Sequence, residues 1–164
     1  MLIFFISDEK LMSFHLKRSN TLPDVMDYNT YGIGNPIMNC IADQTKYDIE
    51  WKHCHFTAGT LLETILMSLE NGHIVWPCSI NKKEWIQKTR ENPGWYLVKK
   101  YGLITDGEDL LLNLASNYLK RQIQLITMFK KGFKMFGKEF SNSKPYNLMC
   151  CQDAGTYSFF LSVL

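Results

Sequence analysis

Residues 32–44 read Gly-Ile-Gly-Asn-Pro-Ile-Met-Asn-Cys-Ile-Ala-Asp-Gln, a glycine turn that leads into a run with helical character. Asn35 is a favoured N-cap residue and Pro36 a favoured first helical residue. Apolar side chains recur after them at helical spacing. The stretch therefore predicts a helix over residues 36–44, with the partial positive charge of its N-terminus beside the glycine turn.

The remaining patterns come in two blocks, with helices first and strands last. The expected helices cover residues 57–71, 81–91 and 106–119, and the expected strands cover residues 122–128, 146–151 and 157–163. Thr105 and Glu108 are spaced as a capping box for the last helix. Strands at the end of the chain must pair with one another. The pattern therefore predicts an α+β or three-layer arrangement with helices covering a small sheet.

Length and composition indicate one folded domain. Of the 164 residues, 46% are hydrophobic, which is enough for a core, and the net charge of +2 neither requires nor excludes an anionic partner. The domain is expected over residues 28–164, after a weakly patterned N-terminal arm at residues 1–27. The apolar run at residues 2–6 is too short for a signal peptide, and no stretch reaches the roughly 18 apolar residues of a membrane span.

The five cysteines are odd in number and irregularly spaced. Disulfide frameworks in secreted domains use even numbers of cysteines at regular spacings. We therefore expect reduced thiols in an intracellular protein, cytoplasmic or nuclear.

The order of four segments resembles the ovarian tumour (OTU) family of deubiquitinating cysteine proteases. Residues 32–44 look like the family's Gly-Asp-Gly-Asn-Cys turn and the helix that follows it. His53-Cys54-His55, ahead of Leu61-Leu62-Glu63, is similar to the family's histidine-led second helix. Both segments belong to the half of the domain that would carry the nucleophile.

The other two segments resemble the second half of an OTU domain. Residues 106–117 and 121–126 look like the family's Gly-Asp-containing helix and the strand after it. Residues 145–149 and 155–158 are similar to its closing pair of strands, which carries a His-Tyr-Asp motif. The likeness covers residues 28–164 and implies an OTU-like α+β fold, in which a small, mostly antiparallel sheet is packed between helices.

The resemblance also places the catalytic positions. The family uses a cysteine nucleophile, an aspartate three residues before it, a histidine base near the C-terminus, and an acidic or amide residue two positions after that histidine. These positions hold Pro36, Ile33, Thr156 and Ser158. Nucleophilic catalysis needs a thiolate and a base within hydrogen-bond reach, and these residues supply neither.

The histidine content agrees with that interpretation. The chain has four histidines, His15, His53, His55 and His73, and none lies in the segment expected to form the closing strands. The resemblance therefore implies a catalytically inactive OTU homologue that needs no cofactor. Ubiquitin or a ubiquitin-like protein is the implied partner, and no nucleic acid is expected.

Two rival functions are considered. In the first, the chain is an active ubiquitin-directed hydrolase in which Cys40, one helical turn after Pro36, is a displaced nucleophile with His53 or His55 as base. The structural interpretation of Cys40 is a small buried apolar residue. In the second, the chain is an interaction domain unrelated to ubiquitin. It would use residues 129–138, where four lysines alternate with aromatic residues, although such lysines also suit an ordinary loop or hairpin.

Two other groups of residues invite a functional interpretation. His53, Cys54 and His55 could bind a metal together with Cys78 or the pair at residues 150–151, but their spacing does not match the paired ligands of zinc sites, so we expect no metal. The aromatic pair at residues 95–96 follows a Pro-Gly turn and is a hypothetical interface anchor.

Overall fold

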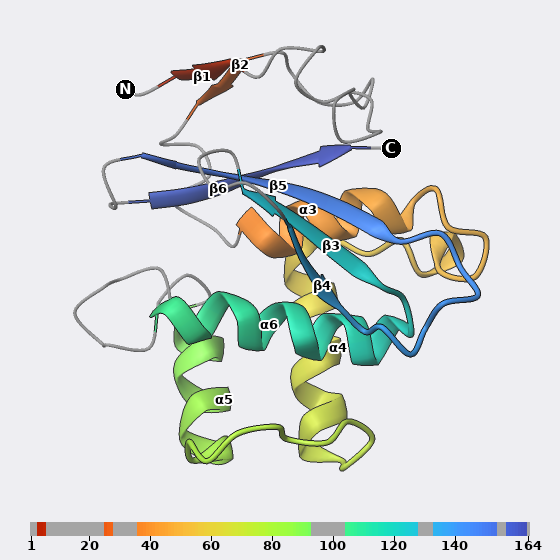
Figure 1. Ribbon diagram of the computed structural model, residues 1–164. Helices are drawn as coiled ribbons and strands as arrows, with labels where there is room; N and C mark the ends of the chain where they lie inside the picture. The colour runs from red at the N-terminus through yellow and green to blue at the C-terminus, as the bar shows by residue number, and fades with distance from the viewer. Residues whose placement is uncertain are drawn as a thin grey trace.

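The computed structural model describes the backbone of residues 3–5, 25–27, 36–92, 104–127, 133–153 and 157–163, and the side chains of residues 37–92, 109–125 and 134–148. The helices are α3 (Pro36–Thr45), α4 (Ala58–Glu70), α5 (Lys82–Glu91) and α6 (Ile104–Leu119), with a short 3₁₀ turn, η1 (Lys52–Cys54), between α3 and α4. The strands are β1 (Ile3–Phe5), β2 (Val25–Asp27), β3 (Ile123–Thr127), β4 (Phe133–Phe136), β5 (Tyr146–Asp153) and β6 (Tyr157–Val163). The α+β class is confirmed (Figure 1).

The main sheet has four strands in the order β4-β3-β5-β6. The outer pairs, β3–β4 and β5–β6, are antiparallel, and the central pair, β3–β5, is parallel. The parallel pair needs a long connection, which runs through β4 and the turn after it. The sheet is therefore small, mixed and mostly antiparallel. Strands β1 and β2 form a separate antiparallel pair.

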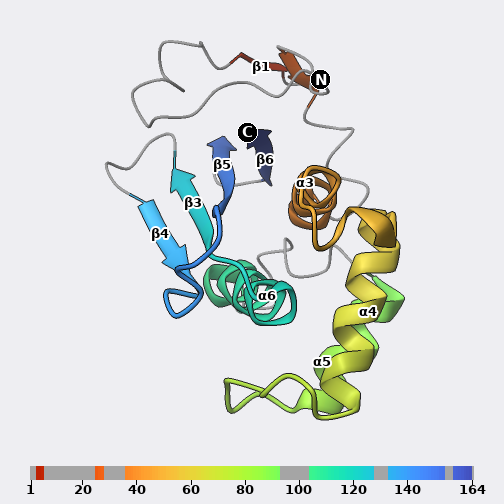
Figure 2. The same cartoon turned by 90° about the vertical axis from the view of Figure 1, so that its right-hand side faces the viewer.

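The four helices lie on one side of the sheet, with α3 and α6 nearest to it and α4 and α5 farther out (Figures 1 and 2). The expectation of a sheet packed between helices is therefore not met by the described helices. The buried side chains of β3 and β5 explain the one-sided packing. Ile123 lies opposite Tyr146 and Leu125 opposite Leu148, and all four are buried. Alternate residues of a strand share a face, so these four form one apolar face for the helices.

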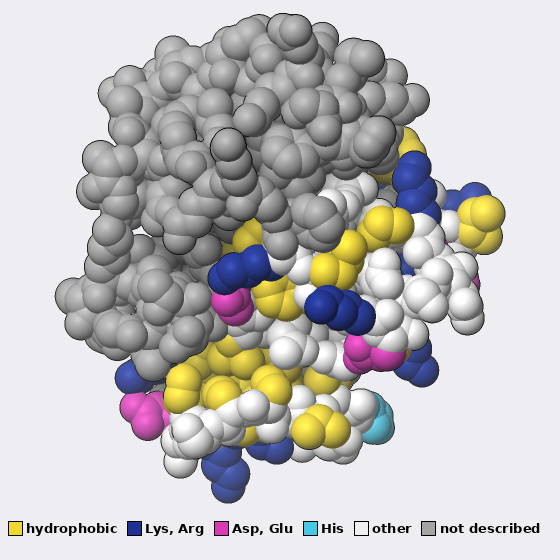
Figure 3. All heavy atoms as spheres, in the orientation of Figure 1, with side chains coloured by type: hydrophobic (Ala, Val, Ile, Leu, Met, Phe, Trp, Pro, Cys, Tyr) yellow, Lys and Arg dark blue, Asp and Glu magenta, His cyan; other side chains and the backbone are white. Residues whose placement is uncertain are grey.

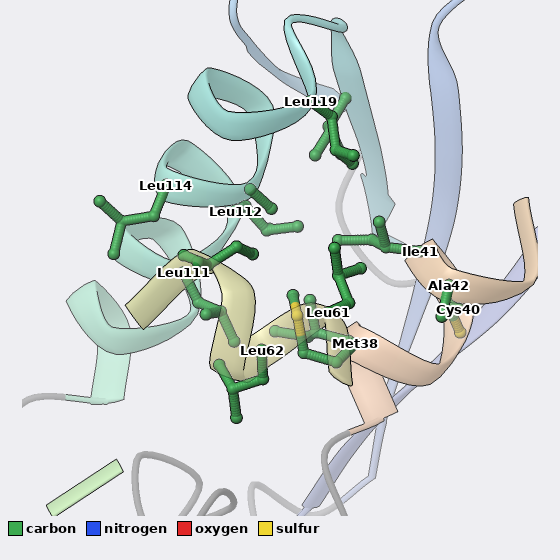
Figure 4. Packing of buried hydrophobic residues seen from close by; sticks show 14 of the residues in the cluster. Met38, Cys40, Ile41, Ala42, Leu61, Leu62, Leu111, Leu112, Leu114 and Leu119 are labelled. Atoms are coloured by element: carbon green, nitrogen blue, oxygen red, sulfur yellow. The ribbon is translucent and has the colours of Figure 1, made fainter. Parts of the chain in front are cut away.

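The hydrophobic core joins α3, α4 and α6. Met38 and Ile41 of α3 meet Leu61 of α4 and Leu111 of α6, and each of these four side chains is fully buried (Figure 4). Fully burying an aliphatic side chain contributes roughly 1.5–3 kcal/mol. The core therefore fixes α3 firmly on the helical layer.

Side-chain caps begin two of the predicted helices. Thr57 caps α4 by accepting a hydrogen bond from the Thr60 N–H, and Asn81 caps α5 by accepting one from the Glu84 N–H. The predicted capping box of α6 is wrong because the helix already begins at Ile104. An N-cap residue needs a non-helical backbone, which a residue inside the helix lacks.

The lysine-aromatic segment, residues 129–138, contains one strand of the hairpin that the sequence offered as its ordinary structure. Its residues 133–136 form β4, which pairs with β3, and Lys134 forms an ion pair with Asp109 of α6 at 3.0 Å. Gly137 follows with φ of +71°, and a Cβ there would collide with the Ser116 hydroxyl. The segment is thus built into the sheet, and its glycine serves a close approach to α6.

Candidate functional site

The first turn of α3 is the position that the resemblance assigns to a nucleophile. Pro36 is the first helical residue, and Ile37 behind it is fully buried. Proline fits there because its fixed φ suits a helix and its missing N–H would have no partner inside the helix. Ile33 lies outside the described residues, and so does the glycine turn.

A side-chain clamp holds the other end of α3. The Gln44 amide donates through Nε2 to the Asn147 carbonyl oxygen at 2.9 Å and accepts the Asn147 N–H through Oε1, also at 2.9 Å. Gln44 is buried, with 6% of its surface exposed. The two bonds fix the C-terminal end of α3 against the beginning of β5.

The clamp also sets the position of α3 along β6. The helix contacts β6 and runs beside it in the same direction (Figure 1). Asn147, which the clamp holds, pairs with Val163 near the end of β6. Pro36 precedes Gln44 by about 12 Å of helix at roughly 1.5 Å per residue. The same distance back along β6, at about 3.4 Å per residue, leads to residues 159–160.

The start of α3 therefore lies beside the middle of β6, at residues 159–160. Ser158, the family's orienting position, is the second residue of β6, whereas Thr156, the base position, lies outside the described residues. Pro36 has no nucleophilic atom and no N–H to stabilise an oxyanion. Helix and strand lie side by side, and the described residues bring no thiolate and no imidazole to that end of α3.

The proposed substitute nucleophile, Cys40, is buried with 2% of its surface exposed. Figure 4 places it on the opposite side of α3 from Met38 and Ile41. His53 and His55 are exposed on and after η1. The burial of Cys40 favours its interpretation as a small apolar core residue.

The cysteine-histidine group forms one recorded contact, between Cys54 Sγ and His53 Nε2 at 3.7 Å. Within the described residues, no three His, Cys, Asp or Glu side chains gather as a metal site would require. The side chains of residues 150–151 fall outside that part, as do residues 95–96. No described helix has the length and apolar character of a membrane span.

A second site, which no sequence pattern indicated, lies at the C-terminal end of α3. A cavity of about 400 Å³ opens there between the end of α3, the turn after it and residues 143–147. Its floor contains Arg121, whose guanidinium contacts Asp48 through Nε at 3.1 Å and through Nη2 at 3.3 Å. The Tyr146 hydroxyl donates to Asp48 Oδ2 at 2.7 Å. These three side chains form a clasp between the turn after α3 and the beginnings of β3 and β5.

The clasp is an ionised network whose Arg121 and Asp48 side chains are largely buried. Burial raises the pKa of Asp48, but hydrogen bonds from Tyr146, the Glu50 N–H and Arg121 outweigh it and hold the pKa below its ordinary value. Burial lowers the pKa of Arg121, and its bonds to Asp48 and Glu50 more than reverse that effect. Burial and the Asp48 charge both raise the pKa of Tyr146. The clasp therefore keeps one negative and one positive charge at neutral pH.

Apolar side chains stand beside this polar floor. Tyr47 and Ile49 line the cavity and are 53% and 82% exposed. In Figure 3, hydrophobic and basic side chains lie next to one another over the segment that follows α3, at the right of the view. Exposed apolar side chains at the rim of a hollow are typical of a contact surface.

Comparison of the chain with protein-family models, with curated proteins and with solved structures finds no match. The resemblance to the OTU family therefore rests on the four sequence segments, and any function is a proposal from them and from the geometry of α3 and β6.

Proposed function

We propose that this chain is a non-catalytic, OTU-like protein that binds ubiquitin or a ubiquitin-like protein. One observation supports the proposal: α3 begins at Pro36 and lies along β6, so that the start of the helix falls beside residues 159–160, next to Ser158. The resemblance expects a nucleophile at the first residue of this helix and a base just before this strand, at position 156. Proline and threonine occupy them instead.

The absence of catalysis follows from the residue chemistry. Proline cannot attack a carbonyl carbon, and a threonine hydroxyl does not accept a proton at neutral pH. Losing a nucleophile or a base costs many orders of magnitude in rate, and here both are missing. A role as a binding surface would explain why α3 and β6 are still arranged around these two positions.

That surface would lie at the start of α3 and along β6. Among the described side chains of α3, Asn39 is the exposed one nearest to Pro36. Placing an arginine at Asn39 adds bulk and charge without entering the core. The matched control is Gln87 on α5, which is also exposed and belongs to the outer part of the helical layer.

The experiment is a titration of the isotopically labelled chain with ubiquitin, followed by the shifts of its backbone amide resonances. We expect shifts at Ile37, Met38 and the first residues of β6. Asn39→Arg should weaken binding about fivefold or more, as expected for a substitution at the centre of a contact. Gln87→Arg should bind like the parent chain.

An electrophilic ubiquitin probe distinguishes binding from catalysis. The proposal expects no covalent adduct. An adduct abolished by Cys40→Ala would establish the rival active hydrolase. No amide shift with ubiquitin or ubiquitin-like proteins would reject the proposed binding and favour an unrelated interaction domain, whose contact with an anionic partner should weaken in salt.

A further inference from the structure

The cavity at the C-terminal end of α3 is separate from the start of that helix and has its own chemistry. We infer that it binds a carboxylate attached to an apolar group, the chemistry shared by a free apolar carboxylic acid and the C-terminus of a peptide. Its volume of about 400 Å³ lies within the range of ligand pockets. The inference does not depend on the proposed binding of ubiquitin.

Arg121 is the first of two cationic groups that line the cavity. Its side chain is 8% exposed and is paired with Asp48. A guanidinium has five N–H donors. Its recorded acceptors are two oxygens of Asp48, the Lys120 carbonyl oxygen and one oxygen of Glu50.

Glu50 is the weak member of that set. Its carboxylate meets Arg121 Nη2 at 3.1 Å, yet its side chain is 71% exposed. An exposed ion pair contributes little and is easily exchanged. A ligand carboxylate can therefore take the place of Glu50 on Arg121 while Asp48 continues to hold the guanidinium in position.

Lys144 is the second cation on the cavity wall, and its side chain is exposed. Among the described carboxylates, none is recorded within ion-pair distance of Lys144. With Arg121 and Asp48 balancing each other, displacement of Glu50 leaves an unbalanced positive charge at Lys144. The site then complements one negative charge.

Several other wall residues are apolar and favour a ligand with an apolar group. Tyr47, Ile49 and Pro145 line the same cavity, and Ile49 is 82% exposed. A cationic ligand fits less well, because Asp48 already accepts hydrogen bonds from Arg121, Tyr146 and the Glu50 N–H. The observations therefore favour an anion with an apolar body.

The test compares 3-phenylpropionate with its uncharged amide, followed by backbone amide shifts of the labelled chain. The acid should shift residues 47–50 and 143–147, and the amide should bind more weakly. Glu50→Gln removes the competing carboxylate and should tighten binding of the acid about two- to fivefold, whereas Lys144→Gln should weaken it by a similar factor. The exposed α5 residues Glu84 and Lys83 provide the matched controls Glu84→Gln and Lys83→Gln, which should change nothing.

The two sources of the ligand are separated with the tripeptide Ala-Ala-Phe, with its C-terminus free or amidated. Tighter binding of the free peptide than of 3-phenylpropionate would identify a peptide C-terminus, and the reverse order a free acid. Three results would overturn the inference: equal shifts from the acid and the amide, no shifts at the cavity with any probe, or weaker binding of the acid by Glu50→Gln. Tighter binding of the acid by Glu50→Gln would carry particular weight in favour of the inference, because a purely structural Glu50 would not tighten binding when neutralised.

Discussion

Replacing Gln44 by methionine should loosen the attachment of α3 to the sheet. Methionine has a similar length and shape but no amide, so both 2.9 Å hydrogen bonds to Asn147 would be lost. A buried polar group left without its partner costs about 1–3 kcal/mol. Water entering from the adjoining cavity can form hydrogen bonds with one of the two unpaired Asn147 backbone groups and so reduce this cost. We therefore expect a loss of about 2–4 kcal/mol, a large part of the 5–15 kcal/mol typical of a domain.

Urea unfolding followed by tryptophan fluorescence measures this loss. The midpoint should fall with an unchanged dependence on urea, because the surface exposed on unfolding stays the same. The melting temperature should fall by about 4–16 °C, at roughly 2–4 °C per kcal/mol for a chain of this size. Hydrogen exchange at the Asn147 amide should accelerate in the same variant.

Gln87→Met is the matched control. Gln87 lies on the exposed face of α5 and donates only to Glu91, one turn along the same helix. Such a pair contributes about 0.2–0.5 kcal/mol. Equal stabilities for Gln44→Met and Gln87→Met would refute the reasoning, because they would mean that the clamp does not fix α3 on β5.

Two further changes test the clasp and the turn after β4. The pKa of Asp48 is lowered in the folded state, so its contribution to stability is present above the unfolded pKa and is lost as the pH falls through the folded value. Tyr146→Phe removes a hydrogen bond to the ionised form, so acid unfolding, followed by circular dichroism, should begin at a higher pH; an unchanged acid midpoint would exclude this role. Gly137→Ala should cost more than about 2 kcal/mol in urea unfolding because of its positive φ and the collision with Ser116. Gly59→Ala, in open space on α4, should instead stabilise by about 0.5–1 kcal/mol, and similar effects at both glycines would contradict the account.

The helices could be located from the sequence because their signals are local. Thr57 and Asn81 cap the helices that follow them, and Gly72 has the positive φ of +75° expected after a helix end. Each signal depends on residues within one turn of the chain. The start of α6 was misplaced because a Thr-x-x-Glu spacing is common and does not by itself exclude a helix that begins earlier.

The order of the strands and the second site could not be read from local patterns. Whether β3 pairs with β5 in parallel depends on contacts between distant segments. The clasp joins Asp48 to Arg121 and Tyr146 across separations of 73 and 98 residues. An arginine, an aspartate and a tyrosine at such distances carry no periodic signal. Arg121 stands just before a predicted strand, but only its burial, which the structure shows, calls for a carboxylate partner.

The central claim is that the start of α3 lies beside residues 159–160 of β6, and that the positions assigned there by the resemblance hold no nucleophile and no base. Nuclear Overhauser contacts between the Ile37 methyl group and the amide protons of residues 158–160 test it most directly in solution. The account predicts these contacts, together with contacts from Gln44 to Asn147 at the other end of the helix. Contacts from Ile37 to the end of β6 instead, or none to β6 at all, would contradict it.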